Sequence, residues 1–226
     1  MSSHILVTYY STFGHVHTLA EAVAAGARAV GGSEVRMRRV PELEAARRAM
    51  AASPPYVRAQ EMMAHVPEVT HDDLRWADGI AWGTPTRFGN MSAQLKQFID
   101  TTGGLWQRGE LEDQPAGVFT STSLIHGGQE ATVLTSVVPL LHLGMVFVGS
   151  PAGENPQIMT ADGVGGSFYG PGTIAGVDGA RQPVESELET ARNLGGRLAR
   201  MAAALRPVRR LQRHGQQPDA PTYQAA

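Results

Sequence analysis

The chain begins with a strand, a polar turn and a helix, and this order constrains the fold more than any other feature. Residues 4–10 are apolar and β-branched or aromatic, which predicts a buried strand. Ser11, Thr12 and Gly14 follow, and apolar residues at helical spacing begin at Val16. A helix that starts directly after a buried strand offers backbone N–H groups to an anion. The turn contains no lysine or arginine, so it predicts a phosphate held by neutral donors, or else an ordinary capped turn.

Strand and helix patterns go on alternating along the chain, and they predict a parallel sheet covered by helices on both faces. Further strands are expected at residues 33–40, 78–83, 116–120 and 145–149, and helices at 91–102, 129–142 and from 183 onward. The predicted fold class is therefore α/β, a doubly wound sandwich with a five-stranded parallel sheet. In such sheets the ligand lies beyond the carboxyl ends of the strands.

Two segments interrupt the alternation. Residues 41–77 form an irregular excursion, in which Thr70 or Asp72 is expected to cap a short helix. Residues 151–180 are rich in glycine and are expected to form a long loop. The polar segment 206–226 is expected to be a disordered tail, so the predicted domain covers residues 1–205.

The composition excludes several kinds of site. The chain has no cysteine, which rules out thiol nucleophiles, disulfides and iron–sulfur clusters. The net charge of −2 gives no reason to expect nucleic acid, and no apolar stretch approaches the about 18 residues of a membrane span. No signal peptide is recognisable, so a cytoplasmic location is expected. His15 and His17 do not share a helix face, so no metal site is expected.

A second polar loop, residues 83–91, follows the third predicted strand. Pro85 fixes one backbone angle and Gly89 permits another, so the loop has a defined shape. Arg87 is a candidate to offset negative charge on a flat ring, and Phe88 is a candidate to cover that ring. A surface ion pair for Arg87 and core packing for Phe88 are the alternatives.

A third loop, residues 120–130, follows the fourth predicted strand and begins with Ser121, Thr122 and Ser123. Such a loop can run along the edge of a flat ring and offer backbone N–H groups to it. His126 either faces the ligand or is a solvated loop residue. Outside the loops, Trp106 in a polar segment can stack on an aromatic substrate or cover a subunit contact.

Five stretches occur in order between residue 4 and about residue 200: YYSTFGH, GTPTRFGNMSAQLKQFIDTTGGLW, GGQE, HLGMVFVG and YGPGTIAGVDGARQPVESELETAR. Together they make the sequence resemble the WrbA family of flavodoxin-like NAD(P)H:quinone oxidoreductases. The combination of GTPTRFGNM with TGGLW is the most specific part. The resemblance implies a flavodoxin-like fold, FMN as cofactor, NADH or NADPH as co-substrate, a quinone substrate and a homotetramer.

The implied reaction is two-electron reduction of quinones to quinols by ping-pong hydride transfer. The flavin would carry it, so no side chain is expected to be catalytic, and His142 is a candidate assistant. Trp106 and Phe13 would line the substrate side. The expected cofactor-binding residues are Ser11, Thr12, Phe13, Gly14, His15, Val16, Pro85, Thr86, Arg87, Phe88, Ser121, Thr122, Ser123, Leu124, Ile125, His126 and His142.

The chain departs from the family pattern at three places, one of which is the tail beyond residue 205, outside the family core. Phe13 stands where the family usually has tyrosine, so the position keeps an aromatic face but has no hydroxyl for a hydrogen bond. The third loop is bulkier at residues 124–126 and one residue longer, which affects how closely its backbone approaches the ring. No arginine is clearly placed in the sequence for the 2′-phosphate of NADPH, so the choice between NADH and NADPH stays open.

Two other functions also stay open. One is a flavodoxin-type electron carrier, which the net charge of −2 and the extra loops disfavour. The other is a non-catalytic flavin-binding protein with a regulatory or interaction role.

Overall fold

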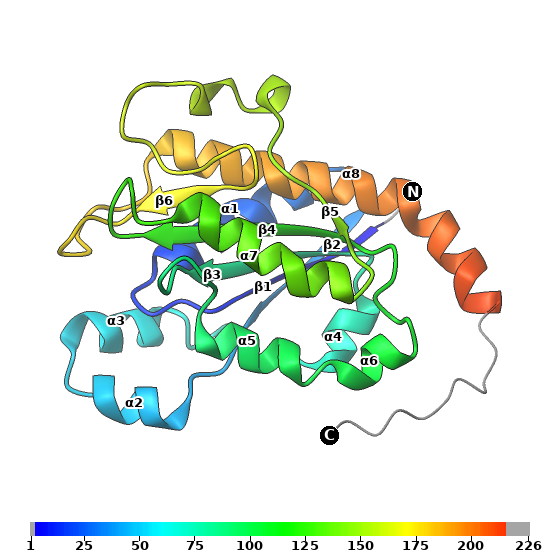
Figure 1. Ribbon diagram of the computed structural model, residues 1–226, viewed down its shortest axis with the longest axis horizontal. Coiled ribbons are helices and arrows are strands. Elements are labelled where there is room, and N and C mark those ends of the chain that lie inside the picture. The colour runs from blue at the N-terminus through cyan, green and yellow to red at the C-terminus, as the bar shows by residue number, and fades with distance from the viewer. Residues whose placement is uncertain (1–2, 216–226) are drawn as a thin grey trace.

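A parallel sheet forms the middle layer of the molecule, with helices on both of its faces (Figure 1). The computed structural model describes residues 3–215, with side chains described as far as residue 209. The strand order β2-β1-β3-β4-β5 confirms the doubly wound α/β fold class. The strands are β1 (Ser3–Tyr9), β2 (Ser33–Arg39), β3 (Gly79–Pro85), β4 (Pro115–Thr122), β5 (Val146–Phe147) and β6 (Gly172–Ile174).

The edge of the sheet beyond β4 differs from the expected five strands, because two short strands share it. β5 pairs with β4 at Pro115 and Ala116, whereas β6 pairs with β4 further along, at residues 120–122. The chain between them leaves the sheet edge and contains the 3₁₀ helices η1 (Ala152–Glu154) and η2 (Pro156–Ile158). The expected loop at residues 151–180 therefore contains a sixth strand. A three-residue strand that begins with glycine carries too few residues for a periodic signal.

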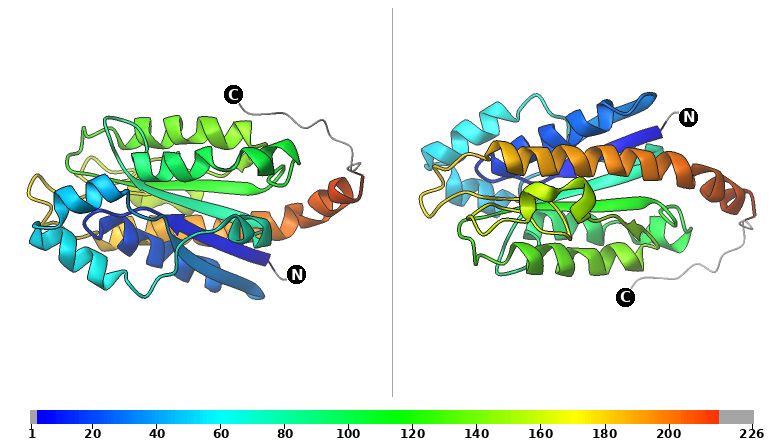
Figure 2. Two further views of the ribbon diagram at one scale, coloured as in Figure 1. Left: turned by 90° about the horizontal axis from the view of Figure 1, so that it is seen from below. Right: turned by 90° about the horizontal axis from the view of Figure 1, so that it is seen from above.

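The helices bury two separate cores, one on each face of the sheet (Figure 2). β1 is buried on both faces, with Ile5 and Val7 in the first core and Leu6 in the second. The first core is closed by α1 (His15–Arg28) and α8 (Glu185–Gly215). The second is closed by α4 (His71–Trp76), α5 (Ala93–Asp100), α6 (Gly103–Gln107) and α7 (Gln129–His142).

The last helix continues past the end of the predicted domain. α8 runs to Gly215, so residues 206–215 are helical rather than disordered. The Arg209 side chain is buried there, and its guanidinium donates to the backbone oxygens of Ala77 and Glu112. The polar composition of this segment favoured disorder, because the contacts that hold Arg209 are made with residues far away in the sequence. Residues 216–226 of the expected tail lie outside the described residues. Within residues 3–215, none of the helices combines the length and apolar character that crossing a membrane requires.

The excursion at residues 41–77 is more ordered than its sequence suggests. It contains α2 (Glu44–Met50) and α3 (Pro54–Met62) as well as α4. Thr70 caps α4, because its side chain accepts from the backbone N–H of Asp73 while the Asp73 carboxylate accepts from that of Thr70. The expectation of a cap at Thr70 is thus confirmed. Ala59 of α3 lies in the first core, which fixes α3 beside the start of α1.

Gly26 and Gly195 allow α1 and α8 to pack at very short range. A Cβ on Gly26 would lie 1.8 Å from the backbone oxygen of Arg192, and a Cβ on Gly195 would lie 1.9 Å from that of Val23. Both obstacles are backbone atoms of a packed helix, which cannot move aside cheaply. The two glycines therefore set the separation at which the apolar side chains of α8 reach the sheet.

Substitution of Gly195 by alanine tests this contact. We expect Gly195→Ala to lower the free energy of unfolding by about 1–3 kcal/mol, although alanine is the better helix former. Urea denaturation followed by circular dichroism measures the change. Gly31→Ala is the matched control, because no heavy atom lies within 4 Å of its would-be Cβ. Equal effects of the two substitutions would show that the contact does not set the helix separation.

Candidate functional site

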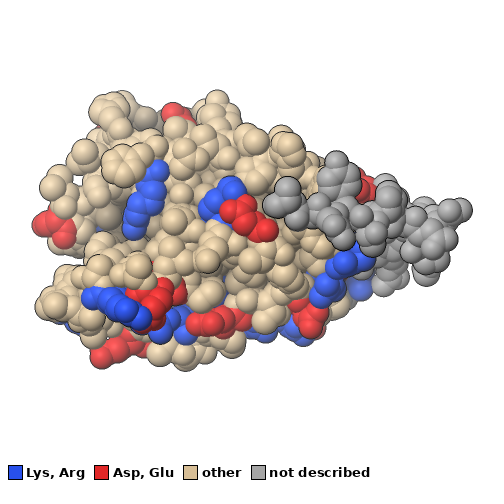
Figure 3. Space-filling model, turned by 60° about the horizontal axis from the view of Figure 1, so that its bottom comes forward, with Lys and Arg blue, Asp and Glu red and all other residues tan. Residues whose placement is uncertain are grey.

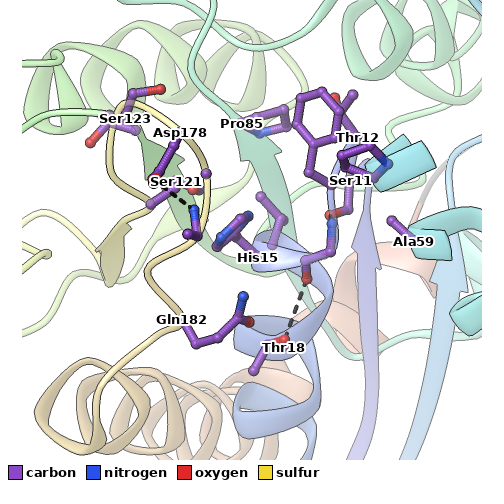
Figure 4. A pocket seen from close by; sticks show the side chains of 18 of the residues that line it. Ser11, Thr12, His15, Thr18, Ala59, Pro85, Ser121, Ser123, Asp178 and Gln182 are labelled. Atoms are coloured by element: carbon purple, nitrogen blue, oxygen red, sulfur yellow. Dashed lines mark hydrogen bonds between the residues drawn. The ribbon is translucent and has the colours of Figure 1, made fainter. Parts of the chain in front are cut away.

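A cavity of about 760 Å³ opens at the carboxyl ends of β1, β3 and β4. Five segments line it: the turn after β1, the end of β3, the end of β4, helix α3 and the loop after β6 (Figure 4). Residues 11–16, 85–87 and 121–123 of the predicted site all belong to this lining. The structure therefore brings together parts of all three loops that the sequence analysis singled out.

The turn after β1 leaves backbone donors free. Gly14 is the N-cap of α1 with a φ of +97°, and no side chain caps the helix. Ser11 Oγ accepts instead from the N–H of Gly14 over 3.1 Å, which closes the turn on itself. The first α-helical hydrogen bond runs from Thr18 N–H to Gly14 O. The N–H groups of His15 and Val16 consequently have no intrahelical partner, and both residues line the cavity.

Arg87 connects the second loop to this turn. Its Nη2 donates to Thr12 Oγ1 over 2.8 Å, and its Nη1 donates to the backbone oxygen of Thr86 over 2.8 Å. Thr12 in turn donates to the Tyr10 hydroxyl, which donates to a Glu42 carboxylate oxygen over 2.6 Å. Within residues 3–209, no carboxylate forms an ion pair with Arg87, in contrast to the surface pair considered as an alternative. The guanidinium is thus held in place with its charge uncompensated.

The third loop contributes only its beginning to the cavity. Thr122 Oγ1 donates to the backbone oxygen of Leu124 and accepts from Gln129 Nε2, which folds the loop back on itself. Leu124, Ile125 and His126 are exposed as a result. In the described chain they do not line the cavity, although the sequence analysis expected them to bind the cofactor.

Three other predicted site residues also lie outside the cavity of this chain. Phe88 projects into solvent from a left-handed backbone with φ of +53°, so it does not pack in a core. Trp106 lies in the short helix α6, where a loop was expected, and is 51% exposed. His142 ends α7, which starts beside Gly89 at the cavity edge and runs toward the opposite end of the sheet.

Helix α3 is a cavity wall that the sequence analysis missed. Ser53, Arg58, Ala59 and Met62 face the cavity from it. Gln60 anchors the helix, because its side-chain amide donates to the backbone oxygens of residues 11 and 12 over 3.2 and 3.4 Å. No sequence motif identifies these residues. The unexplained length of the segment 41–77 was the one feature of the sequence that indicated a function for it.

The loop after β6 is the second missed wall, with residues 175, 177–180 and 182 at the cavity. A fully buried carboxylate, Glu187, holds this loop. It accepts from Thr173 Oγ1 over 2.7 Å and from the N–H of Gly165 over 2.8 Å, and it pairs with Arg181 over 3.0 Å. Arg181 also donates to the backbone oxygen of Ile174. The ion pair and its hydrogen bonds give the loop a defined position.

His15 places a buried ring nitrogen at the cavity. The residue is 6% exposed, and its Nε2 has no hydrogen-bond partner within residues 3–209. Burial lowers the pKa of His15, and backbone groups of Arg181 and Gly179 offset part of this effect. Burial also lowers the pKa of His17, whose Nδ1 lies 2.6 Å from the Tyr9 hydroxyl. Both rings are therefore neutral near pH 7.

Comparisons with known proteins point to one family. Residues 6–156 match the model of the family described as NADPH-dependent FMN reductase. A protein of Geotalea uraniireducens named NAD(P)H dehydrogenase (quinone) is 49% identical over 89% of this chain and 98% of its own length. A protein of the same name from Geobacter sulfurreducens is also 49% identical, with the same coverage of both chains.

Solved structures agree with the architecture. A flavodoxin-like, WrbA-like protein from Agrobacterium tumefaciens superimposes with a TM-score of 0.63 at 26% identity, over 90% of this chain and 99% of that one. A flavodoxin from the domain Archaea superimposes with a TM-score of 0.55 at 17% identity, over 88% of this chain and 99% of that one. The second likeness concerns the fold alone.

The lowered pKa values of His15 and His17 predict how stability depends on pH. Because the unfolded histidines bind protons at higher pH than the folded ones, the free energy of unfolding should fall as pH drops below about 6.5. Urea denaturation at pH 7.5 and 5.5 measures the fall. We expect His17→Gln to reduce it, whereas His126→Gln, which changes an exposed ring, should keep the wild-type difference. An unchanged pH dependence in His17→Gln would contradict the prediction.

Proposed function

The chain belongs to the NADPH-dependent FMN reductase family, and from this premise we propose that it is an FMN-dependent NAD(P)H:quinone oxidoreductase. The cavity is the main support for this proposal. Its lining combines free N–H groups of α1, the Arg87 guanidinium and the polar end of β4. The relatives named NAD(P)H dehydrogenase (quinone) support the reaction, since their similarity extends over 89% of the chain.

The donor set of the cavity fits FMN. The free N–H groups of His15 and Val16 would bind a phosphate, and the buried Nε2 of His15 is a further polar atom without a partner. Residues 85–87 and 121–123 would border the flavin ring, because they line the same cavity at the carboxyl ends of β3 and β4. A phosphate that does not react needs binding rather than activation, so neutral donors suffice in the turn itself.

When bound, FMN supplies two-electron transfer between a nicotinamide and a quinone. Arg87 would stabilise negative charge beside it, because its guanidinium is already oriented by Thr12 and Thr86 and needs no rearrangement. Phe13, 46% exposed at the cavity, offers an aromatic face for a planar substrate. Water can protonate the product, so the proposal assigns no side chain as an obligate acid.

We propose that the nicotinamide and the quinone use the same space in turn. Phe13 is the one phenylalanine, tyrosine or tryptophan among the described cavity residues, so a single stacking position is available to both. Shared occupancy implies ping-pong kinetics, in which the first product leaves before the second substrate binds.

We also propose that the chain forms a homo-oligomer, a tetramer as in the family that its sequence resembles. Leu134, Val138 and Leu141 form an exposed apolar stripe along α7. Figure 3 shows a face on which charged side chains of both signs are separated by wide uncharged areas. Phe88 and Trp106 are exposed outside the cavity of their own chain, which suits residues that complete a neighbouring subunit's site.

Anaerobic reduction tests the reaction. We expect the FMN-loaded protein to lose its visible flavin absorption when NADH or NADPH is added and to regain it when benzoquinone follows. Steady-state rates at several concentrations of both substrates should then give parallel double-reciprocal lines. Intersecting lines would contradict the shared site. FMN that binds but resists both nicotinamides would favour an electron carrier instead.

Charged substitutions on α7 test the assembly. We expect Val138→Glu to shift the protein toward smaller species in light scattering coupled to size exclusion, because a buried unpaired charge is costly at an interface. Val208→Glu, at a position on α8 that is 46% exposed against 54% for Val138, is the matched control and should leave the mass unchanged. If the wild-type protein is a monomer at micromolar concentration, the assembly proposal is wrong.

A further inference from the structure

Three lysine, arginine or carboxylate side chains line the described cavity: Arg58, Arg87 and Asp178. Two of them already have hydrogen-bond partners. Arg87 donates to Thr12 and to the backbone of Thr86, and Asp178 Oδ1 accepts from the N–H of Ala180. Arg58 differs from both, because its side chain makes no hydrogen bond or ion pair within residues 3–209. The α3 wall of the cavity therefore carries an uncompensated positive charge.

Helix α3, which carries Arg58, packs against the turn that starts α1. A Cβ on Gly14 would lie 3.0 Å from Met62 Cε and 4.0 Å from Ala59 Cβ, so the inner face of α3 is in contact with the turn. Arg58 precedes Met62 by four residues and therefore lies on the same face of the helix, one turn away. Gln60 holds this arrangement through the backbone oxygens of Ser11 and Thr12.

Asp178, the one carboxylate of the described lining, does not compensate Arg58. It lies in the loop after β6 (Figure 4), whereas Arg58 lies on α3, and no ion pair joins the two within residues 3–209. Arg58 and the N–H groups that start α1 both line this cavity, and both contribute positive potential to it. A guanidinium forms paired hydrogen bonds with phosphate oxygens. Arg58 together with the N–H groups of α1 therefore matches a phosphate monoester better than an uncharged ligand group.

We propose that Arg58 binds a phosphate monoester, and so supplies from α3 the cation that the phosphate-binding turn lacks. The inference rests on the proposed function, which brings two such groups to this cavity. One is the 5′-phosphate of FMN, absent from riboflavin. The other is the 2′-phosphate of NADPH, absent from NADH. The chemistry is the same for both, and each has a natural counterpart without the phosphate.

The test compares Arg58→Gln with wild type on these two ligand pairs. Fluorescence quenching gives the affinity of the apoprotein for FMN and for riboflavin, and steady-state rates of the FMN-loaded protein give KM for NADPH and for NADH. We expect a loss of about fivefold to tenfold for the phosphate-bearing member of one pair, as for a solvent-accessible ion pair reinforced by hydrogen bonds. The phosphate-free member of that pair should be unaffected.

The pair that responds identifies the source of the phosphate. A change in FMN affinity without a change for riboflavin assigns Arg58 to the flavin. A rise in KM for NADPH without a rise for NADH assigns it to the co-substrate. Arg58→Lys should restore most of the loss, because it keeps the charge, and added salt should weaken wild-type binding more than that of Arg58→Gln.

Arg28→Gln is the matched control, because Arg28 ends α1 at the far end from the turn and does not line the cavity. It should behave as wild type with all four ligands. Equal effects of Arg58→Gln on both members of each pair, or no effect on any, would overturn the inference while leaving the proposed function intact. A wild-type protein that binds neither FMN nor riboflavin would overturn both.

Discussion

The parallel register of β1, β3 and β4 is the constraint on which the site depends. Gly83 pairs with Tyr9 on one side and with Phe119 on the other. A Cβ on Gly83 would lie 2.4 Å from the Phe119 ring and 2.7 Å from Tyr9 Cβ, so only glycine leaves both rings their place. With the three strands in this register, the polar residues that follow them open into one cavity although they are far apart in the sequence.

The sheet alone does not close that cavity; two inserted segments complete it. Residues 41–77 contribute α3, which packs on Gly14 and is anchored by Gln60. The chain after β6 contributes a loop that the buried Glu187 and Arg181 hold in position. In both cases a polar side chain forms hydrogen bonds with the backbone of an irregular segment. Gln60 does so for the turn after β1, and Glu187 does so for the chain around β6. The site is thus a flavodoxin-like sheet edge enclosed by additional walls.

Much of the fold followed from local patterns, and the failures have a common cause. Apolar runs and helical spacing located the strands and helices, and hydroxyl chemistry at Thr70 located a cap, because each signal arises within a few residues. The strand β6 was not predicted, because its three residues are extended through pairing with β4 and not through a pattern of their own. The position of residues 124–126 outside the cavity of a single chain was not foreseen, because the hydrogen bond from Thr122 that folds their loop back cannot be seen in a sequence, and their contact with the cofactor stays a prediction.

Local patterns are enough to specify the α/β class, the turn with free helix donors and the two loops that meet it, since periodicity and turn chemistry are local properties. The residues that close the cavity are specified by contacts between segments that lie far apart in the sequence. Arg58 is the clearest case: its segment carries no motif, and it lines the cavity because Ala59 and Met62 of the same helix pack on Gly14. Side-chain packing between distant segments placed that charge, and no spacing along the chain encodes it.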